Sequence, residues 1–328
     1  MSPRKENGVA LIIVLLIVSI VSVLATQMGA RLQLQVKRAA NIKDNNQAYW
    51  YAMGAEQYAQ KSIKFLLDNS NGVIHLNQPW SEKFVYPLAG GGIEAQLSDM
   101  HACFNLNALQ PQTTAGGNRQ TTPVSELEKA FKRLLTHIDN DIPTYDIDTL
   151  TDSLVDWLDT DDQMHNQGAE DSEYASRQFP YLAANALMVH PSELRMVNGV
   201  KMSWFDKLLP VVCAIPGSTG LTINVNTIDE ENIAVLAATT GLELSAAQSL
   251  IASRDKDGFT TKGAFLADNA INALNLSPEQ QEWFDVTTSH FVLRTRTKYN
   301  NATFAMVTVF AVDKNQTVTV LSREFGTL

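Results

Sequence analysis

The most prominent feature of the hydrophobic pattern is an apolar run near the start of the chain. Residues 9–25 are apolar apart from two serines, and no charged residue occurs from position 7 to position 30. At about 1.5 Å per residue, a helix of this length crosses a bilayer core of about 30 Å. Arg4 and Lys5 precede the run, which predicts a cytoplasmic amino terminus and a carboxyl-terminal bulk across the membrane. A secretory signal peptide cut after Ala25 is the alternative.

The pattern after this run predicts that the helix continues. Residues 31–67 contain no proline, and they place Trp50, Met53 and Lys61 at helical spacing. We therefore expect one helix over residues 9–67, which would form a rod of roughly 90 Å. Half of it would lie in lipid, and half would pack on a folded domain.

Two patterns of different period occupy the rest of the chain. Apolar and polar residues alternate over residues 93–97, and again in three segments near the carboxyl end: 289–298, 303–313 and 317–325. Turn-prone residues separate these last three segments, which predicts antiparallel meander strands. Between about 110 and 285 the apolar stripes have helical spacing, in segments 125–138, 149–158, 183–188, 230–242 and 245–254. The expected fold is α+β, with a long amino-terminal helix on an antiparallel sheet and a large α-helical domain inserted into the sheet region.

The net charge, the cysteines and the absence of catalytic motifs limit the classes of function that the chain can have. A net charge of −10 disfavours a nucleic-acid partner. The two cysteines, Cys103 and Cys213, either form one disulfide outside the cytoplasm or remain buried thiols. Such a disulfide would either tie the helical insert to the sheet or brace the insert itself. No G-x-S-x-G, H-E-x-x-H or P-loop motif occurs, so we expect no enzymatic activity.

One segment concentrates acidic side chains. Residues 139–173 hold twelve of the 35 acidic residues and no lysine or arginine. Within it, Asp159, Asp161 and Gln163 stand at steps of two, and Glu170 is twelfth counting from Asp159. This spacing allows a loop to surround a hard cation with oxygen ligands, which favours calcium. A solvated acidic loop is the alternative.

The match to an EF-hand is incomplete. Met164 stands where that loop needs glycine, and no clear exit helix follows, so we do not assign an EF-hand. His165 is a single nitrogen ligand among oxygens, and we expect it to be a surface residue rather than a zinc ligand. Asp162 is expected to face solvent.

The start of the chain resembles a known signal. A short charged leader that ends in Gly8 before an unbroken apolar helix is similar to the class III signal of type IV pilins and pseudopilins. The resemblance implies that a prepilin peptidase cuts after Gly8 and methylates the new amino terminus at Val9. The fifth mature position, normally glutamate in that family, is Ile13. A carboxylate in hydrocarbon costs about 2.5–3.5 kcal/mol unless a neighbouring subunit's ammonium group pairs with it. A subunit at the tip of a filament has no such neighbour. By resemblance, the absence of this glutamate is typical of the K-class pseudopilins of type II secretion systems.

Four blocks further along the chain resemble the K-class minor pseudopilins: residues 91–109, 154–174, 184–200 and 208–228. This resemblance implies a subunit at the tip of a short periplasmic pseudopilus that initiates assembly and supports export of folded proteins across the outer membrane. It implies a tip complex with the I and J minor pseudopilins, and contacts with other pseudopilins and the prepilin peptidase. Secreted substrates or the outer-membrane secretin are further candidate partners. The localisation implied is the bacterial inner membrane, with one membrane pass and the bulk in the periplasm.

The resemblance also bears on calcium and on domain organisation. The family's W-L-D-x-D and G-A-E-D signatures stand at residues 157–161 and 168–171, and they imply one or two calcium ions, with Asp171 as a further ligand beside the four above. The expected division has five parts: leader 1–8, transmembrane part of the helix 9–28, first pseudopilin part 29–109, helical insert 110–285 and carboxyl-terminal strands 286–328.

A rival interpretation comes from residues 223–266. This segment resembles a helix-hairpin-helix unit of membrane-anchored DNA-uptake proteins. DNA-binding versions offer glycine-rich backbone amides to phosphate. Here the hairpin has one glycine, Gly241, and Glu243 stands where an anion would approach. We therefore interpret the unit as a structural helix pair, with DNA uptake as the alternative function.

Overall fold

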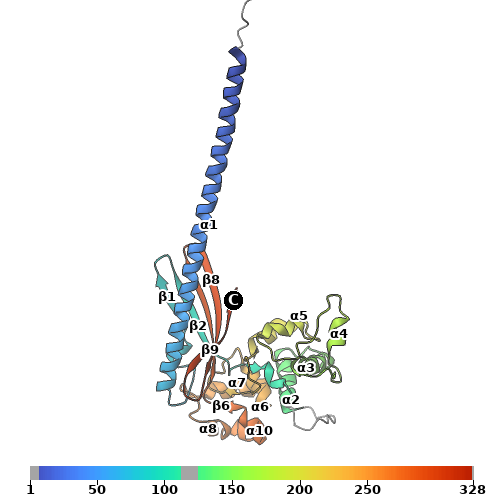
Figure 1. The fold of residues 1–328 in the computed structure, drawn as a ribbon. Helices are drawn as coiled ribbons and strands as arrows, with labels where there is room; N and C mark the ends of the chain where they lie inside the picture. The colour runs from blue at the N-terminus through green and yellow to red at the C-terminus, as the bar shows by residue number, and fades with distance from the viewer. Residues whose placement is uncertain (1–6, 112–124, 327–328) are drawn as a thin grey trace, which may run out of the picture.

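A single long helix dominates the molecule. The computed structural model describes residues 7–111 and 125–326, so residues 1–6 of the expected leader lie outside it. Helix α1 (Asn7–Asn69) continues without a break through Gly29 and Gly54, and it includes the single helix expected over residues 9–67. Its 63 residues correspond to about 95 Å. Figure 1 shows its first half projecting away from the folded part of the chain.

The face of α1 that packs on the sheet consists largely of small residues. The buried positions recur every three or four residues, as one helical face requires: Ala48, Ala52, Ala55, Glu56, Ala59, Ile63 and Leu66. Alanine lets the helix axis approach the strands closely. The larger Trp50 is instead 65% exposed on the other side of the helix.

Five antiparallel strands form the sheet against which α1 lies. They are β1 (Phe84–Leu88), β2 (Gly91–Asp99), β7 (His290–Tyr299), β8 (Ala302–Val312) and β9 (Val318–Phe325), in the spatial order β1-β2-β7-β8-β9. The pairing of β2 with β7 joins segments far apart in sequence, with Leu97 opposite Leu293. The three carboxyl-terminal strands form the expected meander. Their inner face contributes Phe291, Leu293 and Phe310 to a core shared with α1.

The chain between β2 and β7 forms a separate, mainly helical body (Figure 1). Its helices are α2 (Glu126–Ile138), α3 (Thr144–Leu158), α4 (Asp171–Ala175), α5 (Met202–Leu208), α6 (Ile233–Thr240), α7 (Leu244–Ser253), α8 (Lys262–Leu266), α9 (Asn269–Asn272) and α10 (Pro278–Glu282). Two short parallel pairs accompany them: β3 (Phe104–Asn105) with β4 (Val212–Cys213), and β5 (Ile223–Asn224) with β6 (Phe284–Asp285). Ala102 to Leu109 already contribute to the helical core, so this core begins directly after β2.

A disulfide lies where the helical body meets the sheet. Cys103 and Cys213 are bonded, with their Cα atoms 5.8 Å apart. Both lie beside Val292 and Val309, on a different face of the strands from the α1 core. Both cysteines lie in the helical body, whose core begins directly after β2, so the disulfide braces the insert: it links the residue before β3 to the last residue of β4, and this pair packs on the sheet.

Two histidines also meet at this junction. His101 Nε2 lies 3.3 Å from His290 Nδ1, and His101 is buried. Burial, and next the proximity of His101, lower the pKa of His290 to about 4. The imidazole of His290 is therefore neutral near neutral pH.

One predicted helix is wrong. Residues 183–188, which carry an apolar stripe, are not helical. Distant side chains accept hydrogen bonds from the backbone here: Asp171 Oδ1 from Ala183 N at 2.9 Å, and Asn107 Oδ1 from Met188 N at 2.8 Å. Asn185 has φ +46°, which a regular right-handed helix does not contain. Tertiary hydrogen bonds thus replace the helical ones in this segment.

Candidate metal centre

The acidic cluster predicted from the sequence lies where α3 ends. Asp156 is in the last turn of α3, and Asp159 directly follows that helix. Both are buried, although carboxylates are rarely buried without a partner. The chain then loops back so that His165 lies against Asp156. One potential ligand atom from each of Asp156, Asp159 and His165 lies within 4.8 Å of the other two.

Glu170 completes the cluster from the other end of the loop. It precedes α4 and is only 3% exposed, and neither of its carboxylate oxygens has a hydrogen-bond partner among the described residues. Burial, then the nearby charges of Asp156, Asp159, Asp162 and Asp161, raise the pKa of Glu170 to about 7. A buried carboxylate surrounded by other carboxylates is stabilised when a cation neutralises the group.

Glycine at position 168 makes the close approach of the loop possible. A Cβ atom there would lie 1.8 Å from Asp156 Oδ2, closer than any non-bonded contact allows. The backbone of the loop reinforces the arrangement, since His165 N donates to Asp156 Oδ1 at 3.1 Å and Gln167 N donates to Asp152 Oδ2 at 3.1 Å. The loop is therefore shaped around the end of α3.

The structure brings some of the predicted ligands together and separates others. Asp159 and Glu170 are buried at the two ends of the loop, and the charges of Asp159 and Asp161 both raise the pKa of Glu170. Gln163 is exposed, and its backbone N–H donates to Asp161 Oδ1 at 3.0 Å. Asp171 uses Oδ1 to accept from Ala183 N at 2.9 Å, which ties the 183–188 segment to the start of α4. Asp162 is exposed, as expected.

Two residues were misjudged from the sequence. Asp156 was not a candidate, yet it is fully buried at the centre of the cluster. Its spacing of three residues before Asp159 on one helix face was the available signal. His165 was expected at the surface, but it is only partly exposed, and its Nδ1 is hydrogen-bonded to Asp156 Oδ1.

The donor set fits a hard cation. Asp156, Asp159 and Glu170 offer carboxylate oxygens from buried positions, and Asp161 adds another at the margin. Oxygen-rich sets of this kind suit calcium, whereas zinc prefers nitrogen and sulfur ligands. A single imidazole, already hydrogen-bonded to Asp156, does not change that preference.

The second candidate site, the processing junction, lies at the beginning of α1. Gly8 and Val9 are helical, and the side chains of Val9 and Ile13 are exposed. Among the described residues, α1 is the one unbroken helix long and apolar enough to cross a membrane. Helices α6 and α7 reach a comparable apolar length only when taken together, but they are bent by 113° relative to each other, and their apolar faces belong to the helical core.

Comparison with protein-family models gives two matches in the helical body and its flanks. Residues 102–217 match one model described as type II secretion system protein K, and residues 223–287 match a second model with the same description. The second match includes α6 and α7, the helix pair that resembles a DNA-binding unit. No comparison supports the DNA-uptake alternative.

Full-length relatives give the same result. The chain is 34% identical to type II secretion system protein K of Aeromonas hydrophila, over 99% of this chain and 98% of that protein. It is 32% identical to the Klebsiella pneumoniae protein of the same description, over 98% of this chain and 97% of that protein. Among solved structures, it resembles a chain of the GspK-GspI-GspJ complex from enterotoxigenic Escherichia coli. The TM-score is 0.78 at 30% identity, covering 89% of this chain and 100% of the other. The chain belongs to the type II secretion system protein K family, a minor pseudopilin component of that machinery.

Proposed function

We propose that this protein is the tip subunit of the periplasmic pseudopilus, where it binds the I and J minor pseudopilins and initiates filament assembly. The observation that carries the proposal is the similarity over the whole of a solved chain from the GspK-GspI-GspJ complex. This work is assembly and recognition rather than catalysis, and it supports export of folded proteins across the outer membrane.

Ile13 supports the tip position on physical grounds. Its side chain lies in the apolar half of α1, where an unpaired carboxylate would cost about 2.5–3.5 kcal/mol. A subunit within the filament shaft offsets that cost by pairing with the terminal ammonium group of a neighbour. Isoleucine avoids the cost without a neighbour, as the first subunit of a filament requires.

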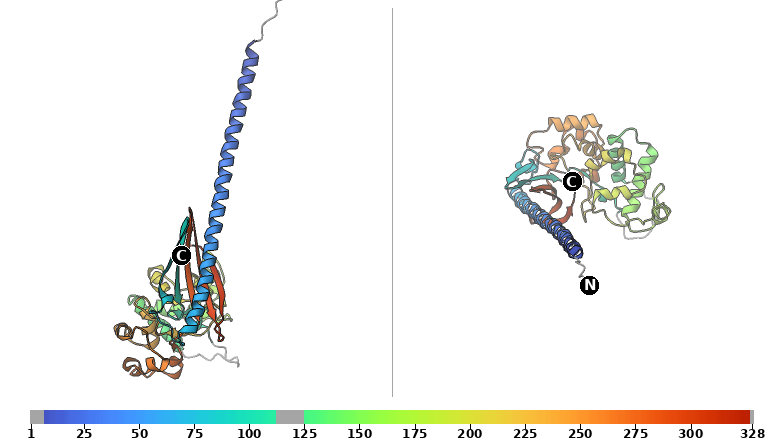
Figure 2. Two further views of the ribbon diagram at one scale, coloured as in Figure 1. Left: turned by 90° about the vertical axis from the view of Figure 1, so that its left-hand side faces the viewer. Right: turned by 90° about the horizontal axis from the view of Figure 1, so that it is seen from above.

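The shape of the molecule supports the same position. Figure 2 shows that the helical body lies beside the sheet and around the end of α1 distant from the apolar segment. Such bulk is accommodated at the end of a filament more easily than between shaft subunits.

The same proposal includes the processing of the anchor. A prepilin peptidase cuts after Gly8 and methylates Val9, and the apolar half of α1 holds the protein in the inner membrane before assembly. Mass spectrometry of the mature amino terminus tests this step. N-methylated Val9 is expected, whereas a terminus at Thr26 would indicate a discarded signal peptide and an intact Met1 or Ser2 an unprocessed anchor.

Co-expression with partners tests the tip role. The full chain is produced with the I and J pseudopilins of the same system, extracted in mild detergent and purified by a tag on this chain. All three proteins are expected in one complex at micromolar concentration. Failure of wild-type protein to associate with either partner would refute the proposed tip complex.

We further propose that the acidic cluster holds calcium, as one or two ions. Asp156, Asp159 and Glu170 would supply the buried oxygens, with Asp161 at the margin. The support is the pair of buried oxygens of Glu170 that have no hydrogen-bond partner among the described residues. Bound calcium would let these carboxylates coexist and would stabilise the loop between α3 and α4.

Chelation combined with a matched variant tests the calcium proposal. At a calcium concentration of 100 times the dissociation constant, binding stabilises the folded state by about 2.7 kcal/mol. Chelator should therefore lower the melting temperature of the wild-type protein. Glu170→Gln should abolish most of this response, while Glu173→Gln, at an exposed position in helix α4 that follows Glu170, should retain it. Identical melting curves for wild type in calcium and in chelator would refute the proposal.

A further inference from the structure

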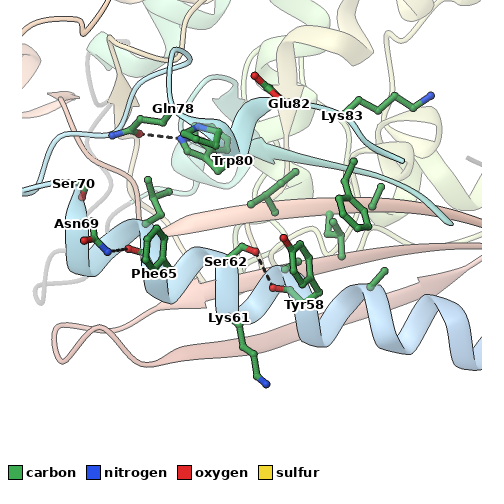
Figure 3. Close-up of a pocket in the computed structure, with 18 residues that line it drawn as sticks. Tyr58, Lys61, Ser62, Phe65, Asn69, Ser70, Gln78, Trp80, Glu82 and Lys83 are labelled. Carbon is green, nitrogen blue, oxygen red and sulfur yellow. Dashed lines mark hydrogen bonds between the residues drawn. The ribbon is translucent and has the colours of Figure 1, made fainter. Parts of the chain in front are cut away.

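The two faces of the five-stranded sheet differ in chemistry. Figure 3 shows the face toward α1, where a hollow beside the helix is lined mostly by apolar and aromatic side chains such as Phe65 and Trp80. On the central strand, β7, Leu293, Thr295 and Thr297 belong to this face and are buried. The residues that alternate with them lie on the opposite face, and all three are cationic and exposed: Arg294, Arg296 and Lys298, called the basic row below.

The basic row is regular and is not matched by acidic residues. At about 3.4 Å per residue, successive members are about 7 Å apart along the strand, so the row is about 14 Å long. The residues that pair with it by register are uncharged apart from one glutamate: Gln96, Glu94 and Gly92 on β2, and Val307, Ala305 and Thr303 on β8. Opposite charges on facing positions would stabilise the sheet, yet Arg294 and Lys298 have none.

The acidic side chains near the row have closer partners. Glu94, opposite Arg296, forms an ion pair with Lys83 at 2.9 Å, and the hydrogen bond from Lys83 lowers the pKa of Glu94 more than the charge of Arg296 does. Glu324 Oε2 on β9 lies 3.4 Å from His190 Nε2. Within the described parts of the chain, no member of the basic row forms an ion pair or donates a side-chain hydrogen bond.

Arg294 also loses part of its hydration. The helical body covers the adjoining part of the same face, where Val292 and Val309 lie beside Cys213 and Ile215. Arg294 is the next position of β7 on this face, and burial lowers the pKa of its guanidinium group without a carboxylate that counteracts the effect. A cation that loses solvent without gaining an acceptor is stabilised when an anion binds to it.

We propose that the basic row binds an extended acidic segment of another protein, with carboxylates at alternate positions. Side chains on one side of an extended segment are also about 7 Å apart, so each carboxylate meets one cation. Arginine binds a carboxylate through two parallel hydrogen bonds. Because the protein has a net charge of −10, such a segment is repelled by most of the surface and attracted to the row. The inference goes beyond the proposed function, since it assigns a ligand to the face of the sheet that α1 does not occupy.

Other classes of anion fit the row less well. Thr297 donates a hydrogen bond to the carbonyl oxygen of Ala48, which stands about 27 Å along α1 from the end of the uncharged segment at Ala30. With α1 upright in a membrane, lipid headgroups are therefore several screening lengths of about 8 Å away from the row. A nucleic acid would bring many phosphates against a protein of net charge −10.

Peptides of equal composition test the proposed spacing. The full-length protein in mild detergent is titrated against labelled peptides, and fluorescence anisotropy reports binding at low and at high salt. One peptide repeats Glu-Thr, and the other repeats Glu-Glu-Thr-Thr, which places carboxylates on any one side about 14 Å apart and leaves a cation unmatched. The alternating peptide should bind about threefold more tightly, as one additional exposed ion pair implies, and high salt should weaken it. Equal affinity for the two peptides would overturn the proposal.

Matched variants locate the binding site. Arg294→Gln/Arg296→Gln/Lys298→Gln removes the basic row, and Lys61→Gln/Lys256→Gln/Lys314→Gln removes three exposed cations elsewhere with the same change in net charge. The row variant should bind the alternating peptide about tenfold more weakly or worse, and the control variant should stay within about twofold of wild type. Equal losses would overturn the proposal, because the attraction would then depend on net charge alone. If the triple row variant melts early, Arg296→Gln/Lys298→Gln keeps Arg294 in place and should still lose about fivefold.

Two further measurements complete the test. Tripolyphosphate that binds more tightly than the peptide, with the same dependence on the row, would overturn the assignment to a protein segment. Association with the I and J pseudopilins should be unchanged in the row variant, and its loss would place the row in a subunit interface and overturn the proposal. Failure of the wild-type protein to associate with either partner would instead refute the tip role and leave the peptide result unaffected.

Discussion

An ion pair buried beneath α1 gives a sharp test of how the helix is fixed to the sheet. The Glu56 carboxylate is fully buried, and it accepts from Arg323 Nε at 2.6 Å, from Arg323 Nη2 at 2.9 Å and from Thr308 Oγ1 at 3.1 Å. Arg323 lies in β9, the edge strand. Replacing it by methionine keeps much of the side-chain volume but removes the cation and two donors.

The magnitude follows from what the change leaves behind. Removing one partner of a buried ion pair costs about 3–5 kcal/mol, because the remaining charge is uncompensated. The Arg323 side chain is 39% exposed, so water can partly solvate the vacated position, and we expect about 3 kcal/mol. Replacing both residues by methionine should recover most of this loss, because neither charge then remains buried.

Hydrogen exchange at the β9 amides is the appropriate assay, because an edge strand opens locally. A loss of about 3 kcal/mol in Arg323→Met should accelerate exchange on the order of 100-fold. The Glu56→Met/Arg323→Met double variant should exchange within about tenfold of wild type. Additive effects of the two single substitutions, or less than a fivefold acceleration in Arg323→Met, would refute the view that this pair holds β9 to α1.

Three further predictions concern other parts of the molecule. Replacing Cys103 and Cys213 together by serine removes a crosslink between residues 110 positions apart, so the free energy of unfolding measured with denaturant should fall by about 4–5 kcal/mol. A decrease below about 1 kcal/mol would contradict this prediction. His290 has a folded-state pKa of about 4, below its unfolded value of 6.5, so the unfolded state binds more protons between these values. The melting temperature of the wild-type protein should therefore fall from pH 7 to pH 4, and that of His290→Asn should fall less steeply. Parallel pH profiles for the two proteins would show that His290 does not contribute to this pH dependence. Gly168→Ala should displace the Asp156 carboxylate and reduce the calcium-dependent melting shift, and an unchanged shift would show that the loop tolerates a Cβ.

Local signals in the sequence were sufficient for most of the elements. The absence of proline and the helical spacing over residues 31–67 predicted the folded half of α1, and alternation predicted β7, β8 and β9 almost to the residue. Helices α2 and α3 were predicted from amphipathic stripes, and the apolar side chains of these stripes are buried in the core of the helical body. These features depend on neighbours within a few positions in the chain, which is why periodicity reveals them.

The acidic site was predicted only in part. Steps of two residues pointed to Asp159, Asp161 and Gln163, and the twelfth position to Glu170, since a loop ligand set leaves a linear pattern. Asp156 was missed because it belongs to the preceding helix, and only the return of the loop over Gly168 brings His165 against it. The failed helix over residues 183–188 has the same origin, because Asp171 and Asn107 compete for its backbone donors from elsewhere in the fold.

By itself, the sequence determined the apolar half of α1, which is long enough to cross a membrane, the change from alternating to helical period, and the acidic loop with its carboxylates. The tertiary structure alone decided that β2 pairs with β7, that the disulfide braces the β3–β4 pair of the helical body, and that Asp156 and Glu170 are buried in one cluster. The physical reason is the range of the interactions. Periodicity and charge clustering are properties of adjacent residues, whereas strand partners and buried carboxylates depend on which distant segments pack together.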